Sequence, residues 1–153
     1  MKNLRAGLIG CGRIGSLLEQ DPLRGKPCTH AGGFQAAPGV EIVAGCDIDK
    51  ARLQTFGKKW KVGNLYVDYR EMLSKESLDI VCVAVWTHLH SEIVLDCTRA
   101  GICGVFCEKP IAFDLRQART MVRACEKKNI PLVINHERRW EARYQKVLKI
   151  IQL

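Results

Sequence analysis

The sequence predicts an α/β protein with a doubly wound parallel sheet of about six strands and helices on both faces. Three observations support this fold class. Short apolar runs alternate with amphipathic segments along the 153 residues, as in a series of right-handed βαβ units. A glycine-rich turn directly follows the first apolar run, and polar residues follow several later runs. In open α/β sheets, ligands bind at these carboxyl ends of the strands.

Length and composition limit the possible classes of protein. A chain of 153 residues is about one domain. The net charge is +8, but the basic residues are scattered without a pattern of interleaved aromatic residues, so we predict no nucleic-acid partner. No apolar run approaches the roughly 20 residues of a membrane span, and the first expected strand begins without the apolar region of a signal peptide. We therefore expect a cytoplasmic protein with no membrane partner.

The eight cysteines are placed like small buried hydrophobic residues. Cys46, Cys82 and Cys107 lie in apolar strand-like runs, and Cys97 and Cys125 lie on apolar helix faces. This placement indicates free thiols in a reducing compartment rather than a disulfide scaffold.

No pattern of cysteines or histidines predicts a metal site. Cys103 and Cys107 lie within one expected strand, and His88 and His90 have no evident third ligand. Cys11 lies in the glycine-rich turn, where it is a candidate for exposure and oxidation.

The N-terminal part of the chain is expected to form a strand, a turn and two helical pieces. The strand covers residues 4–9, and the turn leads into residues 14–19, which can begin a helix. Two prolines and a glycine make residues 21–27 a loop. Thr29 can then cap a helix over residues 30–37.

The rest of the chain continues the alternation of strands and helices. The further strands are expected at residues 41–47, 66–67, 79–85, 102–107 and 131–135. Helices are expected to begin at the capping residues Asp49, Asp68 and Asp114, and another is expected to end at Gly101.

Two apolar stripes mark the C-terminal helices. The helix after Asp114 has a stripe that we expect to be buried, formed by Leu115, Ala118, Met121, Val122 and Cys125. The last segment has a second stripe, formed by Trp140, Tyr144, Val147, Leu148 and Ile151. This second stripe needs a cover, so without a further domain we expect it to pack back on the sheet or to pair with another copy of the chain.

The glycine-rich turn has the pattern G-x-G-x-x-G between an expected strand and an expected helix, a context that predicts a dinucleotide site. Gly10 permits the tight turn, Gly12 lets a pyrophosphate approach the backbone, and Gly15 lets the helix lie close to the strand. Arg13 and Ile14 belong to the same turn. The free N–H groups and the positive end of the helix are then expected to face the phosphates.

Asp47 ends the second expected strand and completes this dinucleotide pattern. A carboxylate here accepts hydrogen bonds from the adenosine ribose and repels a 2′-phosphate, which favours NAD over NADP. The separation from the glycines is larger than usual because of the inserted loop. The alternative is that Asp47 or Asp49 only caps the next helix; we assign the ribose contact to Asp47 and the cap to Asp49.

Two groups of polar residues follow the carboxyl ends of later strands. Trp86, Thr87 and His90 follow the fourth expected strand, and His90 is expected at a helix start that faces the cofactor crevice. Glu108 and Lys109 follow the fifth expected strand. On an ordinary surface such a pair is solvated and worth little, but beside the crevice it is a candidate for substrate chemistry.

These motifs together resemble the N-terminal domain of the glucose-fructose oxidoreductase / inositol dehydrogenase (Gfo/Idh/MocA) family. The matching segments are residues 10–15, 46–49, 87–90, 108–112 and 135–140, in family order along nearly the whole chain. The resemblance implies a Rossmann-type fold and NAD(P)-dependent oxidation or reduction at a carbinol or ketone, commonly of a sugar or polyol. Glu-Lys-Pro, which starts at residue 108, is the most specific of these segments.

The resemblance also implies roles for individual residues. Lys109 matches the family lysine that orients the substrate beside the nicotinamide, so it is the expected catalytic residue. Trp86, Thr87 and His90 match residues that line the nicotinamide side of the pocket, although Trp86 replaces the usual proline. Glu108 is grouped with the cofactor-binding residues and is expected to hold Lys109.

Family members have a second α/β domain, which carries substrate residues. We therefore expect residues 1–136 to form the dinucleotide-binding domain and residues 137–153 to form a helix that leads toward a second domain absent from this chain. Alone, the chain is expected to be incomplete for turnover, as an excised domain, a truncated product or half of a split enzyme would be. Its expected partner, besides the substrate, is either the missing second domain or another copy of the chain in a homo-oligomer. The alternative function is a stand-alone NAD-binding sensor without catalysis.

Overall fold

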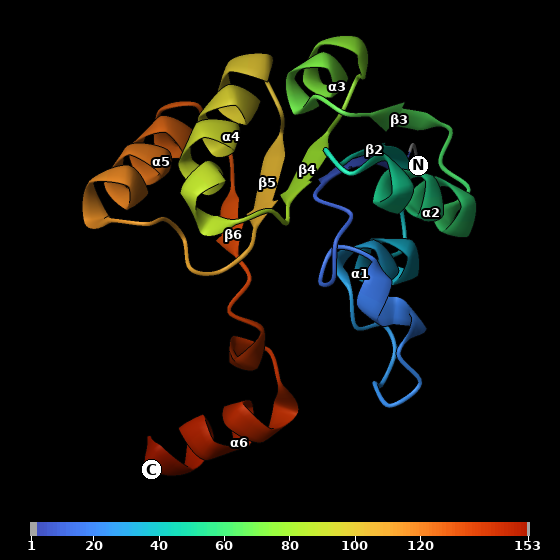
Figure 1. Cartoon of the computed structure of the whole chain (residues 1–153). Coiled ribbons are helices and arrows are strands. Elements are labelled where there is room, and N and C mark those ends of the chain that lie inside the picture. Colours follow the sequence, from blue (N-terminus) through green and yellow to red (C-terminus); the bar gives the residue numbers. More distant parts are fainter. Residues whose placement is uncertain (1–2, 153) are drawn as a thin grey trace.

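A computed structural model describes residues 3–152, which form one parallel sheet with helices on both sides (Figure 1). The strands are β1 (Leu4–Ile9), β2 (Val40–Cys46), β3 (Asn64–Tyr66), β4 (Ile80–Val83), β5 (Gly104–Cys107) and β6 (Leu132–Ile134). Their order in the six-stranded sheet is β3-β2-β1-β4-β5-β6, and every neighbouring pair is parallel. The chain winds outward from β1 to β3 and then from β4 to β6. The predicted doubly wound fold is confirmed.

Six helices are described, and four of them begin after a side chain that supplies a capping oxygen. They are α1 (His30–Ala36), α2 (Lys50–Trp60), α3 (Tyr69–Lys75), α4 (Thr87–Ala100), α5 (Leu115–Lys127) and α6 (Ala142–Ile151), with 3-10 turns η1 (Leu17–Gln20) and η2 (Glu137–Arg139). The side chains of Thr29, Asp49, Asp68 and Asp114 each accept a backbone N–H of the helix that follows. Gly101 ends α4 with a φ of +77°, a left-handed conformation that glycine adopts without strain.

Successive residues of the central strands face two separate apolar cores, as the pleat of a strand requires. In β4, Val81 and Val83 pack in the core beneath α3, α4 and α5, whereas Cys82 packs in the core beneath α1 and α2. Both cores exclude solvent, which explains why the β4 region is apolar throughout.

The helix expected to begin within residues 14–19 is not an α-helix. Residues 14–16 form a turn, followed only by the short η1. The N–H groups of Leu17 and Leu18 bond carbonyls five residues earlier, a spacing that does not continue an α-helical ladder. After the loop, the N–H of His30 donates to the carbonyl of Ile14, so α1 begins beside the glycine turn. A helix that continued directly from the turn would have occupied this position.

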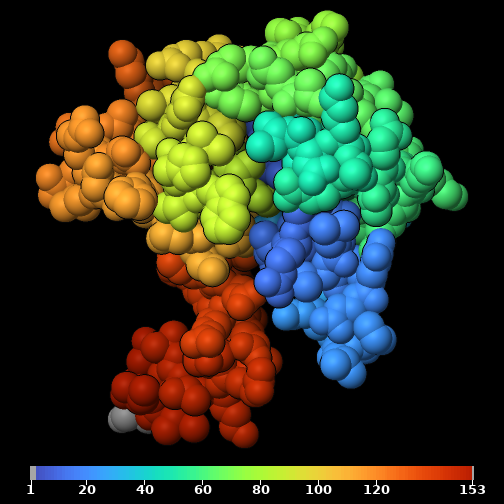
Figure 2. Space-filling view, viewed as in Figure 1, coloured from blue at the N-terminus to red at the C-terminus, as the bar shows by residue number. Residues whose placement is uncertain are grey.

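The two predicted C-terminal stripes are less covered than expected. On α5, Met121 and Cys125 are buried, but Leu115 is 64% exposed and Val122 is 37% exposed, because nothing among the described residues covers that side of the helix. On α6, the apolar side chains are also exposed. Figures 1 and 2 show η2 and α6 below the sheet, joined to it by a narrow connection. Of the two expected arrangements, packing back on the sheet is therefore wrong, and pairing with another copy stays a prediction.

All eight cysteines are free, and the predicted core positions Cys46, Cys82, Cys97, Cys107 and Cys125 are buried. Cys11 is also fully buried, with its Sγ 3.6 Å from the carbonyl oxygen of Cys46. Burial and the nearby Asp47 charge raise the pKa of the Cys11 thiol, so the expected exposure and oxidation of this residue are not supported. Within residues 3–152, no helix has the length and apolar character needed to cross a membrane.

Candidate active site

The glycine turn lies where the strand order reverses, between the carboxyl ends of β1 and β4. Gly10 has a φ of +96°, and a Cβ there would lie 2.4 Å from the carbonyl oxygen of Ala84, beyond the end of β4. A Cβ on Gly15 would lie 2.0 Å from the carbonyl oxygen of Gly10. Both positions therefore exclude any side chain. In doubly wound sheets this reversal point is where ligands bind.

The surface of the turn is open at Gly12. A Cβ at this position would meet only Nη1 of Arg52, at 3.5 Å. The backbone N–H groups of Gly12, Arg13 and Ile14 find no hydrogen-bond acceptor in the part of the chain that the structure describes. Adjacent unpaired N–H groups in a turn form a site that suits pyrophosphate oxygens, so these residues fit a dinucleotide. Only the short η1 follows, so the positive end of a helix contributes less here than expected.

Asp47 is buried and accepts a backbone hydrogen bond from the glycine turn. Its Oδ2 accepts the N–H of Cys11 at 2.9 Å, and its Oδ1 accepts the N–H of Asp49 at 2.9 Å. Nη2 of Arg52 lies 3.4 Å from the same Oδ1. Asp49 accepts the N–H groups of Ala51 and Arg52, which confirms it as the cap of α2. A carboxylate has about four lone-pair positions, so Asp47 retains capacity for ribose hydroxyls.

This geometry predicts that Asp47→Ala changes stability as well as cofactor choice. The substitution leaves the N–H groups of Cys11 and Asp49 without their carboxylate acceptor, which should cost about 2–4 kcal/mol of folding free energy. We also expect weaker NAD binding and better tolerance of NADP. Urea unfolding and calorimetric titration with both cofactors check the two effects. Equal binding of NAD and NADP by the unchanged protein would contradict the assignment of Asp47.

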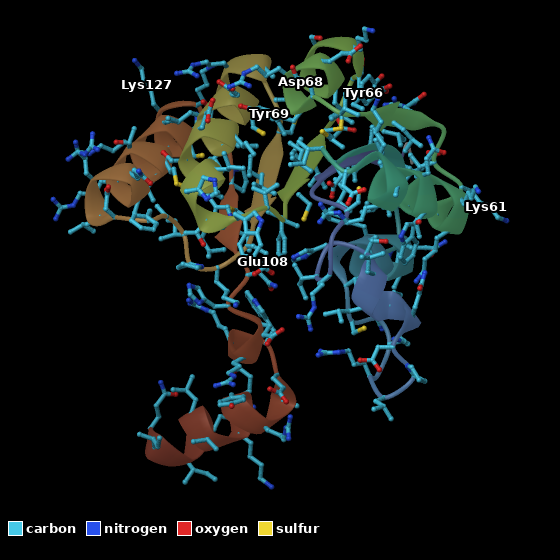
Figure 3. The ribbon with its side chains drawn as sticks, viewed as in Figure 1. Lys61, Tyr66, Asp68, Tyr69, Glu108 and Lys127 are labelled. Atoms are coloured by element: carbon cyan, nitrogen blue, oxygen red, sulfur yellow. The ribbon has the colours of Figure 1, made fainter. Side chains whose placement is uncertain are left out.

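Glu108 is a buried carboxylate at the carboxyl end of the sheet, labelled in Figure 3. Its Oε1 accepts the side-chain amide of Asn135 at 2.7 Å and lies 2.9 Å from Nε2 of His30. Its Oε2 accepts the backbone N–H of Lys109 at 3.1 Å. Burial alone would raise the pKa of Glu108, but hydrogen bonds from His30, Asn135 and the Lys109 N–H outweigh it and keep that pKa below its usual value.

Two expectations about Glu108 and the turn at Lys109 are corrected. Glu108 holds the backbone of Lys109 rather than its ammonium, and its carboxylate contacts His30 and Asn135. Its assignment to the cofactor-binding residues stays a prediction. Lys109 itself is exposed and forms no ion pair with any described residue, so the alternative of a surface salt bridge is not supported.

The lowered pKa of Glu108 predicts a pH-dependent stability. Between the native pKa and about 4.3, the usual value for Glu, the unfolded chain binds a proton that the native protein does not. Stability therefore rises with pH in this window and is lost as the pH falls through the native pKa. The other titratable groups facing Glu108 are His30, Cys82 and Cys107, and burial raises the pKa of both thiols.

Urea unfolding between about pH 3 and 7 tests this expectation. The unchanged protein should lose stability on acidification more steeply than the Glu108→Gln variant. Parallel curves for the two proteins would contradict it.

His90 does not face the crevice as expected, because its side chain is fully buried. Nδ1 lies 3.0 Å from the carbonyl oxygen of Pro110, and Nε2 lies 3.1 Å from that of Val85. His90 therefore connects the loop after β4 to the Lys109 turn. Of its expected neighbours in the pocket, Trp86 is 79% exposed and Thr87 is half-buried at the start of α4.

The roles of His30 and Asn135 are not predictable from the sequence. His30 reads as an ordinary loop or cap residue, and 78 positions separate it from Glu108. Asn135 follows β6, and 27 positions separate it from the same carboxylate. No local pattern in the sequence indicates either contact.

The glycine turn and Asp47 thus fit a dinucleotide, and comparison with known proteins decides the family. Residues 4–136 match the family described as "Oxidoreductase family, NAD-binding Rossmann fold" (GFO_IDH_MocA). The chain belongs to this family. The predicted family and the Rossmann-type fold are confirmed, and so is NAD as cofactor, because the family is described as NAD-binding.

Named dehydrogenases are among the relatives of this chain. It is 35% identical over 147 residues to the D-apiose dehydrogenase of Paraburkholderia graminis, covering 96% of this chain and 36% of the relative. It is 28% identical over 149 residues to the myo-inositol 2-dehydrogenase of Thermotoga maritima, covering 97% of this chain and 41% of the relative.

Solved structures have the same architecture. The myo-inositol 2-dehydrogenase of Lactobacillus plantarum matches with a TM-score of 0.84 and 28% identity, over 99% of this chain and 41% of that one. The WlbA dehydrogenase of Bordetella pertussis, solved with NADH and UDP-GlcNAcA, matches with a TM-score of 0.84 and 27% identity, over 99% and 42%. The chain therefore spans about two fifths of the length of these relatives.

Proposed function

We propose that this domain serves an enzyme that transfers a hydride between NAD and a carbinol or ketone of a sugar or polyol. The observation that carries the proposal is the turn at Lys109. It follows β5, the neighbour of β4, and so lies at the same edge of the sheet as the glycine turn. The lysine is exposed there, and its ammonium has no partner among the residues that the structure describes, while its backbone is held by a buried carboxylate.

Each part of the site has a distinct task in this proposal. The N–H groups of Gly12, Arg13 and Ile14 bind the pyrophosphate, and Asp47 accepts the ribose hydroxyls. Bound NAD supplies the hydride-transferring ring, and Trp86 and Thr87 border its nicotinamide side.

Lys109 acts on the reacting oxygen of the substrate. Oxidation of a carbinol removes its hydroxyl proton, and the reverse reaction returns it. An ammonium within hydrogen-bond distance orients this oxygen and stabilises the negative charge that develops on it.

The substrate class rests on the relatives. Their names specify apiose and inositol, a sugar and a polyol, and both contain carbinol carbons. Asp47 favours the unphosphorylated ribose of NAD, so NADP is the weaker cofactor in this proposal.

We further propose that residues 137–153 lead to a second, substrate-binding domain, or pair with another copy of this chain. On α6, Tyr144, Val147, Leu148 and Ile151 are between 45% and 74% exposed, and Trp140 before the helix is 70% exposed. Sedimentation of the isolated chain tests this surface. A strictly monomeric chain with a fully solvated α6 would contradict pairing between copies.

Calorimetric titration of the chain with NAD and NADP tests the cofactor site, and we expect tighter binding of NAD. Hydride transfer is then followed by NADH absorbance with inositols and apiose, for the chain alone and together with a substrate domain. Turnover is expected only with the second domain. Failure to bind NAD would contradict the proposal, and NAD binding without turnover in the complete protein would favour the sensor function.

A further inference from the structure

His30 contacts both halves of the candidate site. Its backbone N–H donates to the carbonyl of Ile14, in the glycine turn, at 3.0 Å. Its ring Nε2 lies 2.9 Å from Oε1 of Glu108, whose other oxygen accepts the N–H of Lys109. A single residue thus connects the turn that faces the cofactor phosphates to the turn that presents the lysine.

The surroundings of His30 hold its ring in one position. The hydroxyl of Thr29 accepts the N–H of Gly32 and so anchors the start of α1. The His30 ring packs edge-on against Phe106 of β5, with 5.3 Å between ring centroids. Phe34 of α1 also packs edge-on against the ring of Phe106, with 6.4 Å between the ring centroids. These contacts limit rotation of the histidine away from the carboxylate.

The contact between His30 and Glu108 is shielded from water. The exposed fractions of the two side chains are 7% and 8%. Water therefore cannot easily replace the histidine as a donor to the carboxylate, and Asn135 alone would remain on Oε1. Losing a donor to a buried carboxylate is costly, so the geometry of Glu108 depends on His30.

We infer that His30 is a positioning residue, which acts through Glu108 to hold the Lys109 turn in a fixed relation to the glycine turn. The inference rests on the proposed function of Lys109 for its catalytic meaning, but the mechanical connection is testable without turnover. It predicts that a ligand bound only at the glycine turn influences Lys109 through His30.

Amide hydrogen exchange, measured by NMR on the 153-residue chain, tests the connection. In His30→Leu the Lys109 amide should exchange about tenfold faster, because Glu108 no longer holds it in place. His30→Gln retains a side-chain donor and should restore most of the protection, whereas His30→Asn, with a shorter side chain, should not. The matched control is His136→Leu, which makes the same change at an exposed histidine next to Asn135 and should leave the exchange unchanged.

Binding of ADP tests the influence of one turn on the other. ADP has a pyrophosphate but no nicotinamide, so it should affect Lys109 only through the protein. We expect ADP to shift the Lys109 amide signal in the unchanged protein and in His136→Leu, and to leave it unshifted in His30→Leu. ADP affinity should remain within about threefold, because residue 30 keeps its backbone N–H bond to Ile14.

The inference would be overturned if the Lys109 amide exchanged in His30→Leu and His30→Asn at the same rate as in the unchanged protein. An undiminished ADP-induced shift in those variants would overturn it as well. If the unchanged protein binds no ADP, the proposed cofactor site fails, and exchange without ligand still decides the role of His30.

Discussion

Lys109→Met should lower the turnover of the complete oxidoreductase by about 100-fold or more, with NAD affinity nearly unchanged. Methionine has a similar length but no charge and no donor, so it cannot orient the substrate oxygen or stabilise charge on it. The Lys109 side chain is exposed and unpaired among the described residues, and its backbone N–H, which the substitution keeps, is the group that Glu108 holds. The fold should therefore tolerate the change.

A matched substitution separates loss of this ammonium from loss of positive charge in general. Lys127 ends α5, far from Glu108 in Figure 3, and Lys127→Met should leave turnover unchanged. The measurement is kcat and KM for an inositol or apiose substrate, together with NAD affinity. Full activity of Lys109→Met, or full dehydrogenase activity from this chain without a second domain, would overturn the mechanism.

Gly12→Val should abolish NAD binding while the domain stays folded. A Cβ at Gly12 meets only the guanidinium of Arg52, at 3.5 Å, which is ordinary van der Waals contact, so the fold has room for a side chain. In the proposed site, the pyrophosphate approaches through this space the N–H groups of the turn that have no acceptor among the described residues. We expect at least about a 100-fold loss of affinity by calorimetry, because the phosphates are kept off the backbone.

Gly10→Ala provides the contrasting control. Its Cβ would lie 2.4 Å from the carbonyl oxygen of Ala84, and its φ of +96° is unfavourable for alanine. Backbone strain and overpacking together should cost about 2–5 kcal/mol of folding free energy. Urea unfolding should therefore separate the two variants. Unchanged NAD affinity in Gly12→Val, or unchanged stability in Gly10→Ala, would contradict the roles of these glycines.

The sequence by itself determined the elements that depend on near neighbours. The strand positions, the caps at Thr29, Asp49 and Asp114 and the glycine turn were all predictable, because an apolar run, a capping oxygen or a glycine acts within a few residues of its own position. The family match covers residues 4–136, which include all of these elements. The helix expected at residues 14–19 was wrong, because the N–H groups of Leu17 and Leu18 bond carbonyls five residues earlier and only a short 3-10 helix follows.

Only the tertiary structure decided which distant groups meet. Glu108 receives His30 from α1 and Asn135 from the end of β6, and neither partner has a local signal. The same holds for Cys11 and His90, whose burial depends on elements remote in sequence that pack over them. Hydrogen bonding and burial of this kind are set by how strands and helices assemble, so the pairing around Lys109 is a property of the folded sheet and not of any segment of the chain.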